Sequence, residues 1–110
     1  MSNLFEVSDP RGHKIICTED CWNEHILFNR PWMIGWENEV QKAIESPHMG
    51  IFQDNAYKNR EIYYGLSAGK ERYIKVVVES KDQNYGEVIT AFPTDSPKSG
   101  ERMIWPTSKD

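Results

Sequence analysis

The pattern of apolar and polar residues separates an early part of the chain with helical spacing from a later part with strand-like runs. Apolar residues recur every 3.6 residues from about Trp36 to Glu45, which predicts an amphipathic helix that Pro47 ends. An earlier helix is predicted from Thr18, whose hydroxyl can cap its N-terminus, to a point before Pro31. Both predicted helices therefore precede most of the predicted strands.

Short runs of β-branched and aromatic residues, separated by polar and glycine-containing loops, predict strands after residue 48. These runs are residues 49–54, 60–66, 72–79, 86–92 and 102–105. Residues 4–7 and 13–18 predict an N-terminal hairpin whose turn contains Asp9, Pro10 and Gly12. Helices followed by strands with short connections are typical of an α+β fold. We expect one domain over residues 1–110, with the hairpin and two helices packed on one face of a four- to five-stranded antiparallel sheet.

The register of the last predicted hairpin decides which polar side chains meet on the sheet. If residues 80–85 form a six-residue loop, Glu79 pairs with Gly86, and Lys75 pairs with Thr90. The alternation in the two strands predicts which residues share a face with Lys75, namely Tyr73, Val77, Val88, Thr90 and Phe92. The preceding hairpin brings Tyr63 or Tyr64 next to Lys75. This register predicts a cation beside a hydroxyl and a phenol.

The charge balance limits the partners that the chain can attract. Asp and Glu number 17 against 13 Lys and Arg, and the net charge of −4 gives no general attraction to nucleic acid. Any RNA site must therefore depend on a local basic patch. No apolar run approaches the roughly 20 residues that span a bilayer, and residues 1–10 lack a basic segment followed by an apolar one. We expect a cytoplasmic location.

The cysteines and histidines do not form a metal-binding pattern. Cys17 and Cys21 are expected to be reduced and packed, since their spacing across a strand-to-helix junction matches no disulfide framework or complete metal site. His13, His25 and His48 lie on three separate predicted elements without ligand spacing. Phosphate-binding glycine loops and a Gly-x-Ser-x-Gly elbow are also missing from the sequence. We expect neither a metal nor a cofactor.

Three residues have the chemical capacities that metal-free RNA cleavage needs. The reaction requires a base for the 2′-hydroxyl, an acid for the leaving oxygen and donors for the phosphate. His25 can exchange protons near neutral pH, Lys75 can neutralise a phosphate, and Thr90 can hydrogen-bond one of its oxygens. Structural explanations remain open: His25 can be a hydrogen-bonded core histidine, Lys75 a solvated or edge-strand lysine, and Thr90 an ordinary strand residue. If Trp22 and Ile26 anchor the first helix, His25 faces the Lys75–Thr90 pair.

Further candidates lie at the margins of this predicted cleft. Arg60 and Tyr63 can contact a substrate, or can form only surface ion pairs and sheet packing. Residues 96–102 contain Lys98 and flexible backbone that can close over an anion, or can form a solvated loop. The tail from about residue 106 is expected to fray.

The order of motifs resembles a known nuclease superfamily. The segments "FEVSDPRGHKIICTEDCWNEHIL", "AIESPHMGIFQD", "REIYYG", "YIKVVVE" and "GEVITAFPT" are similar to the barnase–EndoU–colicin–RelE-like (BECR) nucleases, especially the small branch of phages, mobile elements and polymorphic toxins. The resemblance spans Phe5 to about Thr94. It implies a metal-independent ribonuclease that cleaves RNA, often tRNA, and leaves a 2′,3′-cyclic phosphate.

The resemblance also implies roles for individual residues. His25 corresponds to the acid/base residue, Lys75 to the phosphate-stabilising cation and Thr90 to a substrate-orienting hydroxyl, with Arg60 and Tyr63 at the cleft margin. Where relatives often have a His-Pro pair after the helix, this chain has Arg30 before its proline. Arginine can bind phosphate there but cannot act as a base at neutral pH.

Two functions are therefore predicted. The first is a toxin-like endoribonuclease that acts on RNA, possibly tRNA, with a cognate immunity or antitoxin protein as a further partner. The alternative is a non-catalytic immunity-like protein, or an inactive relative, whose acidic surface binds a basic protein. An enzyme requires the candidate residues to meet in one cleft, whereas an inhibitor requires a contiguous acidic surface.

Overall fold

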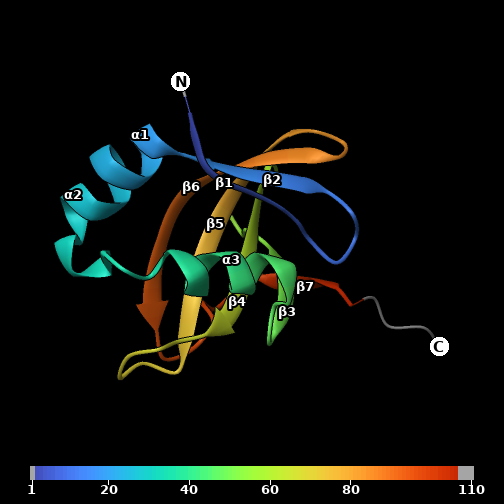
Figure 1. Ribbon diagram of the computed structural model, residues 1–110. Coiled ribbons are helices and arrows are strands. Elements are labelled where there is room, and N and C mark those ends of the chain that lie inside the picture. The colour runs from blue at the N-terminus through green and yellow to red at the C-terminus, as the bar shows by residue number, and fades with distance from the viewer. Residues whose placement is uncertain (1, 107–110) are drawn as a thin grey trace.

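The computed structural model describes residues 2–106, and most of the tail that the sequence predicts to fray lies outside this range. Figure 1 shows the chain order of the helices and strands. The helical elements are α1 (Glu19–Cys21), the π-helix η1 (Trp22–Ile26), α2 (Leu27–Asn29), the 3₁₀ helix η2 (Pro31–Met33) and α3 (Glu37–Glu45). The strands are β1 (Asn3–Ser8), β2 (Lys14–Thr18), β3 (Gly50–Gln53), β4 (Arg60–Leu66), β5 (Tyr73–Asp82), β6 (Tyr85–Thr94) and β7 (Arg102–Trp105).

The strands form one mixed sheet of seven strands in the order β1-β2-β6-β5-β4-β3-β7. The α+β class is confirmed, but the prediction of a four- to five-stranded antiparallel sheet is wrong. The N-terminal hairpin joins the sheet instead of packing on its face, because β2 pairs in parallel with β6 through residues 14–16 and 85–87. This pairing gives hydrogen-bond partners to backbone groups of β6 that would otherwise lie on an open edge.

The predicted helices are present, with one departure from regular geometry. The Thr18 hydroxyl accepts a hydrogen bond from the Cys21 amide at 3.0 Å, so the predicted cap is confirmed. The helical segment then contains the π turn η1 before it ends ahead of Pro31. Helix α3 crosses one face of the sheet (Figure 1) and buries Val40, Ala43 and Ile44.

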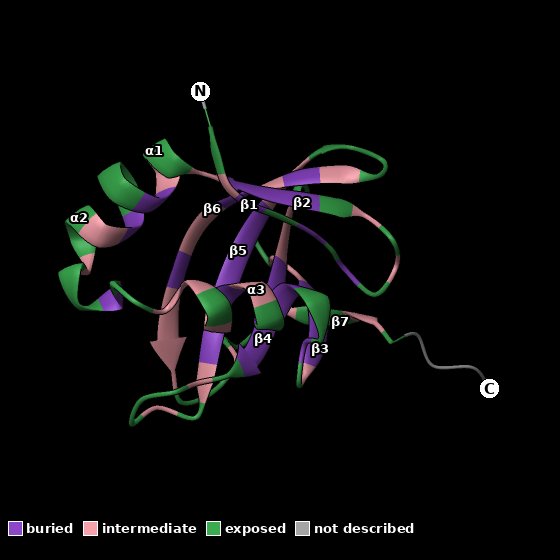
Figure 2. Cartoon of the chain, viewed as in Figure 1, coloured by how far each residue is buried: buried purple, intermediate pink, exposed green. Residues whose placement is uncertain are grey.

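Apolar side chains pack on both faces of the sheet. The main core lies between α3, η1 and one face, and includes Ile74, Val76 and Val78 of β5. A smaller cluster on the other face contains Phe52, Ile62, Tyr64 and Val77. The alternation predicted for β5 is therefore confirmed, and Figure 2 shows how buried positions follow the central strands. No helix in residues 2–106 has the length and apolar character needed to cross a membrane.

The predicted register of the β5–β6 hairpin is wrong. The turn consists of Gln83 and Asn84 alone, since Asp82 already pairs with Tyr85, and Lys75 faces Phe92. Thr90 faces Val77. The register shifts twice, at Lys81 in β5 and at Ile89 in β6, each shift marking an extra residue in one strand. These bulges cannot be inferred from the alternation alone.

The bulge at Ile89 also changes which side chains share a face. Val88, predicted beside Thr90, packs in the main core with α3, while Ile89 packs with the smaller cluster. Beyond the bulge, Thr90 and Lys75 lie on the same face but are diagonal neighbours. In β4, Lys75 pairs with Tyr64, one of the two tyrosines predicted beside it. Lys75 therefore has its predicted phenol but not Thr90 directly opposite.

Candidate active site

A hollow opens beside β6, at the point where β2 leaves it. The last residue of β2 that pairs with β6 is Ile16, after which the chain turns into α1 and η1. The Cys21 thiol then donates a hydrogen bond to the Val88 carbonyl at 3.1 Å, which joins the helix to the strand. The hollow has a volume of about 550 Å³ and is lined by Thr18, Cys21, His25, Arg60, Glu87, Val88, Ile89 and Thr90.

His25 enters the hollow from η1 and is exposed. Its neighbours Trp22 and Ile26 are 2% and 0% exposed and fix the helix on the core. In the π turn the Leu27 amide donates to the Trp22 carbonyl, five residues earlier. His25 therefore turns outward between two buried anchors, and its ring makes no hydrogen bond within residues 2–106. The interpretation of His25 as a hydrogen-bonded core residue does not fit this position.

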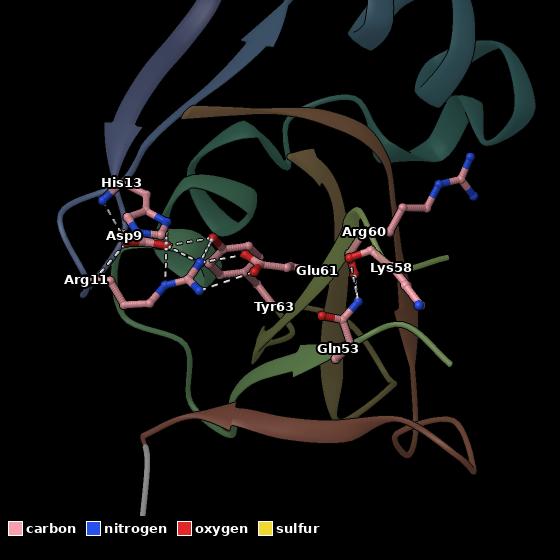
Figure 3. A network of polar contacts seen from close by, with 8 residues as sticks. All are labelled: Asp9, Arg11, His13, Gln53, Lys58, Arg60, Glu61 and Tyr63. Carbon is pink, nitrogen blue, oxygen red and sulfur yellow. Dashed lines mark hydrogen bonds and ion pairs between the residues drawn. The ribbon is translucent and has the colours of Figure 1, made fainter. Parts of the chain in front are cut away.

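Arg60 is placed by the tight turn that precedes β4. The Gln53 side-chain amide donates to the backbone carbonyls of Tyr57, Lys58 and Arg60 at 3.0–3.2 Å. The Asp54 carboxylate accepts from the amides of Ala56 and Tyr57 at 2.8 Å. Figure 3 shows the Gln53 contacts and the Arg60 side chain pointing away from them. The turn thus fixes the backbone that leads into Arg60, the cation of the hollow.

The guanidinium of Arg60 lies over an aromatic ring and has no ion-pair partner in the described part of the chain. Its Cζ atom is 4.2 Å from the centroid of the Tyr57 ring. Its Nε atom is buried without a hydrogen-bond partner. A buried donor on a charged group is costly to leave unpaired, so this geometry favours an anion in the hollow.

Lys75 lies outside the hollow and has a carboxylate partner. It is only 8% exposed, and its Nζ atom is 2.9 Å from Oε2 of Glu101, whose side chain is fully buried. Tyr64 donates to the other oxygen of Glu101 at 2.5 Å and accepts from the Lys98 amide at 3.2 Å. Burial and the Glu101 carboxylate raise the pKa of Tyr64. The loop predicted to close over an anion thus supplies its own anion to Lys75.

Arg30 and Thr90 lie on the same side of β6. The Arg30 Cζ atom is 4.6 Å from the centroid of the Phe92 ring, and Phe92 follows Thr90 by two residues along the strand. Arg30 also makes no ion pair within residues 2–106. The hollow therefore has a second unpaired cation beside it.

Tyr63 lies on the opposite face of the sheet, away from the hollow. Its hydroxyl donates to Asp9 at 2.7 Å, and Arg11 bridges Asp9 and Glu61 at 2.7 and 2.6 Å (Figure 3). Burial and the hydrogen bond to Asp9 raise the pKa of Tyr63. The structure thus brings together His25, Thr90 and Arg60, but places Tyr63 and Lys75 in separate polar clusters.

Several residues of the hollow were not predicted from the sequence. Glu87 lines it with an oxygen that accepts from the Tyr85 hydroxyl at 3.0 Å, and Cys21 forms part of its wall. The Cys21 sulfur beside it and burial raise the pKa of the Cys17 thiol, so this thiol is protonated at neutral pH. The aromatic residue three positions before Arg60 is a sequence signal for the stacked guanidinium. For Glu87, a two-residue turn at Gln83–Asn84 would not have been enough, because the bulge at Lys81 shifts its partner from Ser80 to Glu79.

The described residues contain no group of three or more His, Cys, Asp or Glu side chains arranged to hold a metal. A scan against protein-family models, a search of curated proteins and a search of solved structures find no match to this chain. The residues of the hollow are therefore what indicates a function for this chain.

Proposed function

We propose that the chain is a metal-independent endoribonuclease of the BECR-like type, with the hollow beside β6 as its active site. The observation that carries this proposal is the Arg60 guanidinium, which is unpaired within residues 2–106 and shares the hollow with His25 and Thr90. A cation, an exposed imidazole and a hydroxyl are the groups that phosphodiester transfer requires. Three distant segments of the chain supply them.

The proposed reaction begins with attack of an RNA 2′-oxygen on the adjacent phosphorus. Glu87 takes the 2′-hydroxyl proton, and His25 gives a proton to the 5′-oxygen as its bond to phosphorus breaks. Arg60 and Thr90 hold the non-bridging oxygens while charge develops on them. The products are a 2′,3′-cyclic phosphate and a 5′-hydroxyl. Glu87 replaces the second histidine found in relatives, and Arg60 replaces Lys75 as the phosphate cation.

The distribution of charge allows an acidic chain to bind RNA at this place. The buried or half-buried carboxylates of Asp9, Glu61 and Glu101 are each paired with a cation elsewhere. Arg30 and Arg60 face aromatic rings instead. Two cations without an ion-pair partner in residues 2–106 therefore lie in or beside the hollow, where they can form the local basic patch that RNA binding requires. A cognate immunity protein would inhibit the enzyme by covering this hollow.

The test is cleavage of total tRNA in excess chelator by the wild-type protein and by His25→Ala. We expect discrete fragments with cyclic phosphate ends from the wild type, and a rate about 10²–10⁴-fold lower for the variant. His48→Ala is the matched control, because His48 is also exposed but stacks on Tyr73 away from the hollow. Equal cleavage by wild type and His25→Ala would refute the role of His25. Absence of cleavage by the wild type would favour the non-catalytic alternative.

A further inference from the structure

Large apolar side chains are exposed on the segment that follows His25. Phe28, Trp32 and Ile34 are 78%, 53% and 71% exposed. Figure 2 shows that α2 and the turn after it are largely exposed at one side of the molecule. Single exposed apolar residues are common, but three within seven residues make this segment a candidate contact surface.

The buried side of this segment is packed and hydrogen-bonded, so its exposed side chains have defined positions. Met33 is fully buried, and its amide donates to the Arg30 carbonyl at 2.9 Å. The Trp36 amide donates to the Met33 carbonyl at 3.0 Å. The rings of Trp32 and Trp36 meet edge to face with centroids 5.9 Å apart. Trp32 is thus exposed on one side and supported on the other.

The exposed segment is continuous with the hollow through Arg30. Arg30 lies between Phe28 and Trp32 in sequence, and its guanidinium covers Phe92. Phe92 and Thr90 project from the same face of β6, about 7 Å apart at the spacing of an extended strand. That separation is comparable to the distance between neighbouring phosphates along a polynucleotide. Two unpaired arginines therefore flank a path that leads from the hollow to the exposed aromatic rings.

We propose that Phe28, Arg30 and Trp32 bind an unpaired RNA strand next to the scissile phosphate, with the rings stacking on bases and Arg30 holding a neighbouring phosphate. The substrate is then single-stranded or looped RNA with several nucleotides on one side of the cut. Aromatic rings and guanidinium planes are the groups on which unstacked bases pack. The bases of a duplex are paired and stacked on one another, so their faces cannot stack on these side chains. This inference rests on the proposed function for the identity of the strand.

The experiment measures binding without cleavage. The probe is a fluorescein-labelled mixed-sequence strand of about 12 nucleotides with 2′-O-methyl groups throughout, which removes the attacking hydroxyl. Its affinity is compared with that of the same strand in a perfect duplex by fluorescence anisotropy. We expect tighter binding of the single strand and a loss of about tenfold in affinity for Trp32→Ala. Trp32→Tyr, which keeps an aromatic ring, should bind close to the wild type.

Leu66→Ala is the matched control, because Leu66 is 61% exposed and lies outside the proposed path. Equal affinity of wild type, Trp32→Ala and Phe28→Ala for the single strand would overturn the proposal. So would tighter binding of the duplex, or self-association in sedimentation that Trp32→Ala abolishes while RNA binding is unchanged. The probe cannot be cut, so binding is measured independently of cleavage. RNA binding through Trp32 without tRNA cleavage would refute the proposed ribonuclease activity but not the strand-binding path. Cleavage without this binding would refute only the strand path.

Discussion

Individual cations in this protein differ in what they face. Arg11 and Lys75 each contact a carboxylate at 2.9 Å or less, whereas Arg30 and Arg60 lie on aromatic rings and make no ion pair within residues 2–106. Removing one partner of a buried ion pair destabilises the fold because the other charge is left unpaired, whereas a cation without such a partner is available to a ligand. The residue type alone does not distinguish these roles, since Lys75 and Arg60 are both strand cations.

Substitution of Arg60 should therefore lower the cleavage rate, whereas substitution of Lys75 should lower the stability of the fold. Arg60→Met is expected to slow RNA cleavage about 10²–10³-fold with little change in the free energy of unfolding. Lys75→Met leaves the Glu101 carboxylate buried without its cation and is expected to cost about 3–5 kcal/mol of stability. Urea denaturation and cleavage assays measure the two effects separately.

Lys81→Met is the control for Lys75→Met, because the ion pair of Lys81 with Glu79 is exposed and screened by solvent, so its loss should change stability far less. If Lys75→Met abolished cleavage at unchanged stability while Arg60→Met cut RNA normally, the role predicted for Lys75 from the sequence would stand.

At the scale of elements, α3 lies unusually close to β4 at one glycine. A Cβ atom on Gly65 would lie 2.5 Å from the Ala43 Cβ atom and 2.7 Å from the Ala43 Cα atom. Helix and strand therefore meet almost backbone to backbone at this crossing. The contact fixes α3 on one face of the sheet, and the alternation in β4 places Arg60 on the other face, with Ile62 and Tyr64.

Gly65→Ala should move α3 away from the sheet. The clash involves helix backbone and cannot be relieved by a rotamer change, so we expect a loss of about 1–3 kcal/mol in the free energy of unfolding. Leu66→Ala, at the exposed adjacent residue, should change it by no more than about 0.5 kcal/mol. Equal urea midpoints for Gly65→Ala and the wild type would show that this contact is not tight.

The elements could be predicted from the sequence where local chemistry specifies them. Thr18 capping, the spacing of apolar residues in α3 and the alternation in β5 are all local signals. The parallel pairing of β2 with β6 could not be predicted, because it joins segments about 70 residues apart without a turn signal. The same limit affected the site: His25 and Thr90 were found by residue type, but Lys75 forms an ion pair with the distant Glu101, and Arg60 is the cation that lines the hollow with them.

At the scale of the whole molecule, the Asp9 cluster joins parts of the sheet that are not neighbours. Its contacts connect the β1–β2 turn to β4, and β6 and β5 lie between β2 and β4 in the strand order. Burial alone would raise the pKa of Asp9, but hydrogen bonds from Tyr63, Arg11 and the His13 amide outweigh it. The pKa of Asp9 therefore lies below its usual value of 3.8.

This cluster predicts a pH dependence of global stability. Because the pKa of Asp9 is lower in the folded state, its favourable contribution is complete above about pH 4 and is lost as the pH falls through the folded value. Asp9→Asn should lower the free energy of unfolding by about 1–3 kcal/mol at pH 7 and less at pH 3. Urea denaturation of wild type and Asp9→Asn between pH 3 and pH 7 tests this pH dependence.

Glu6→Gln serves as the comparison for Asp9→Asn, since the Glu6–Lys14 pair is exposed at 3.6 Å. A constant difference between Asp9→Asn and the wild type from pH 7 to pH 3 would contradict the assigned role of Asp9.

The parallel contact between β2 and β6 also determines when the hollow can exist during synthesis. Its walls come from residues 18–25, from Arg60 and from residues 87–90, so a growing chain that has not yet released β6 from the ribosome lacks one side of it. Contacts between such distant segments form late, after the intervening chain has been ordered. A nascent chain therefore completes its hollow only after residues 87–90 have emerged.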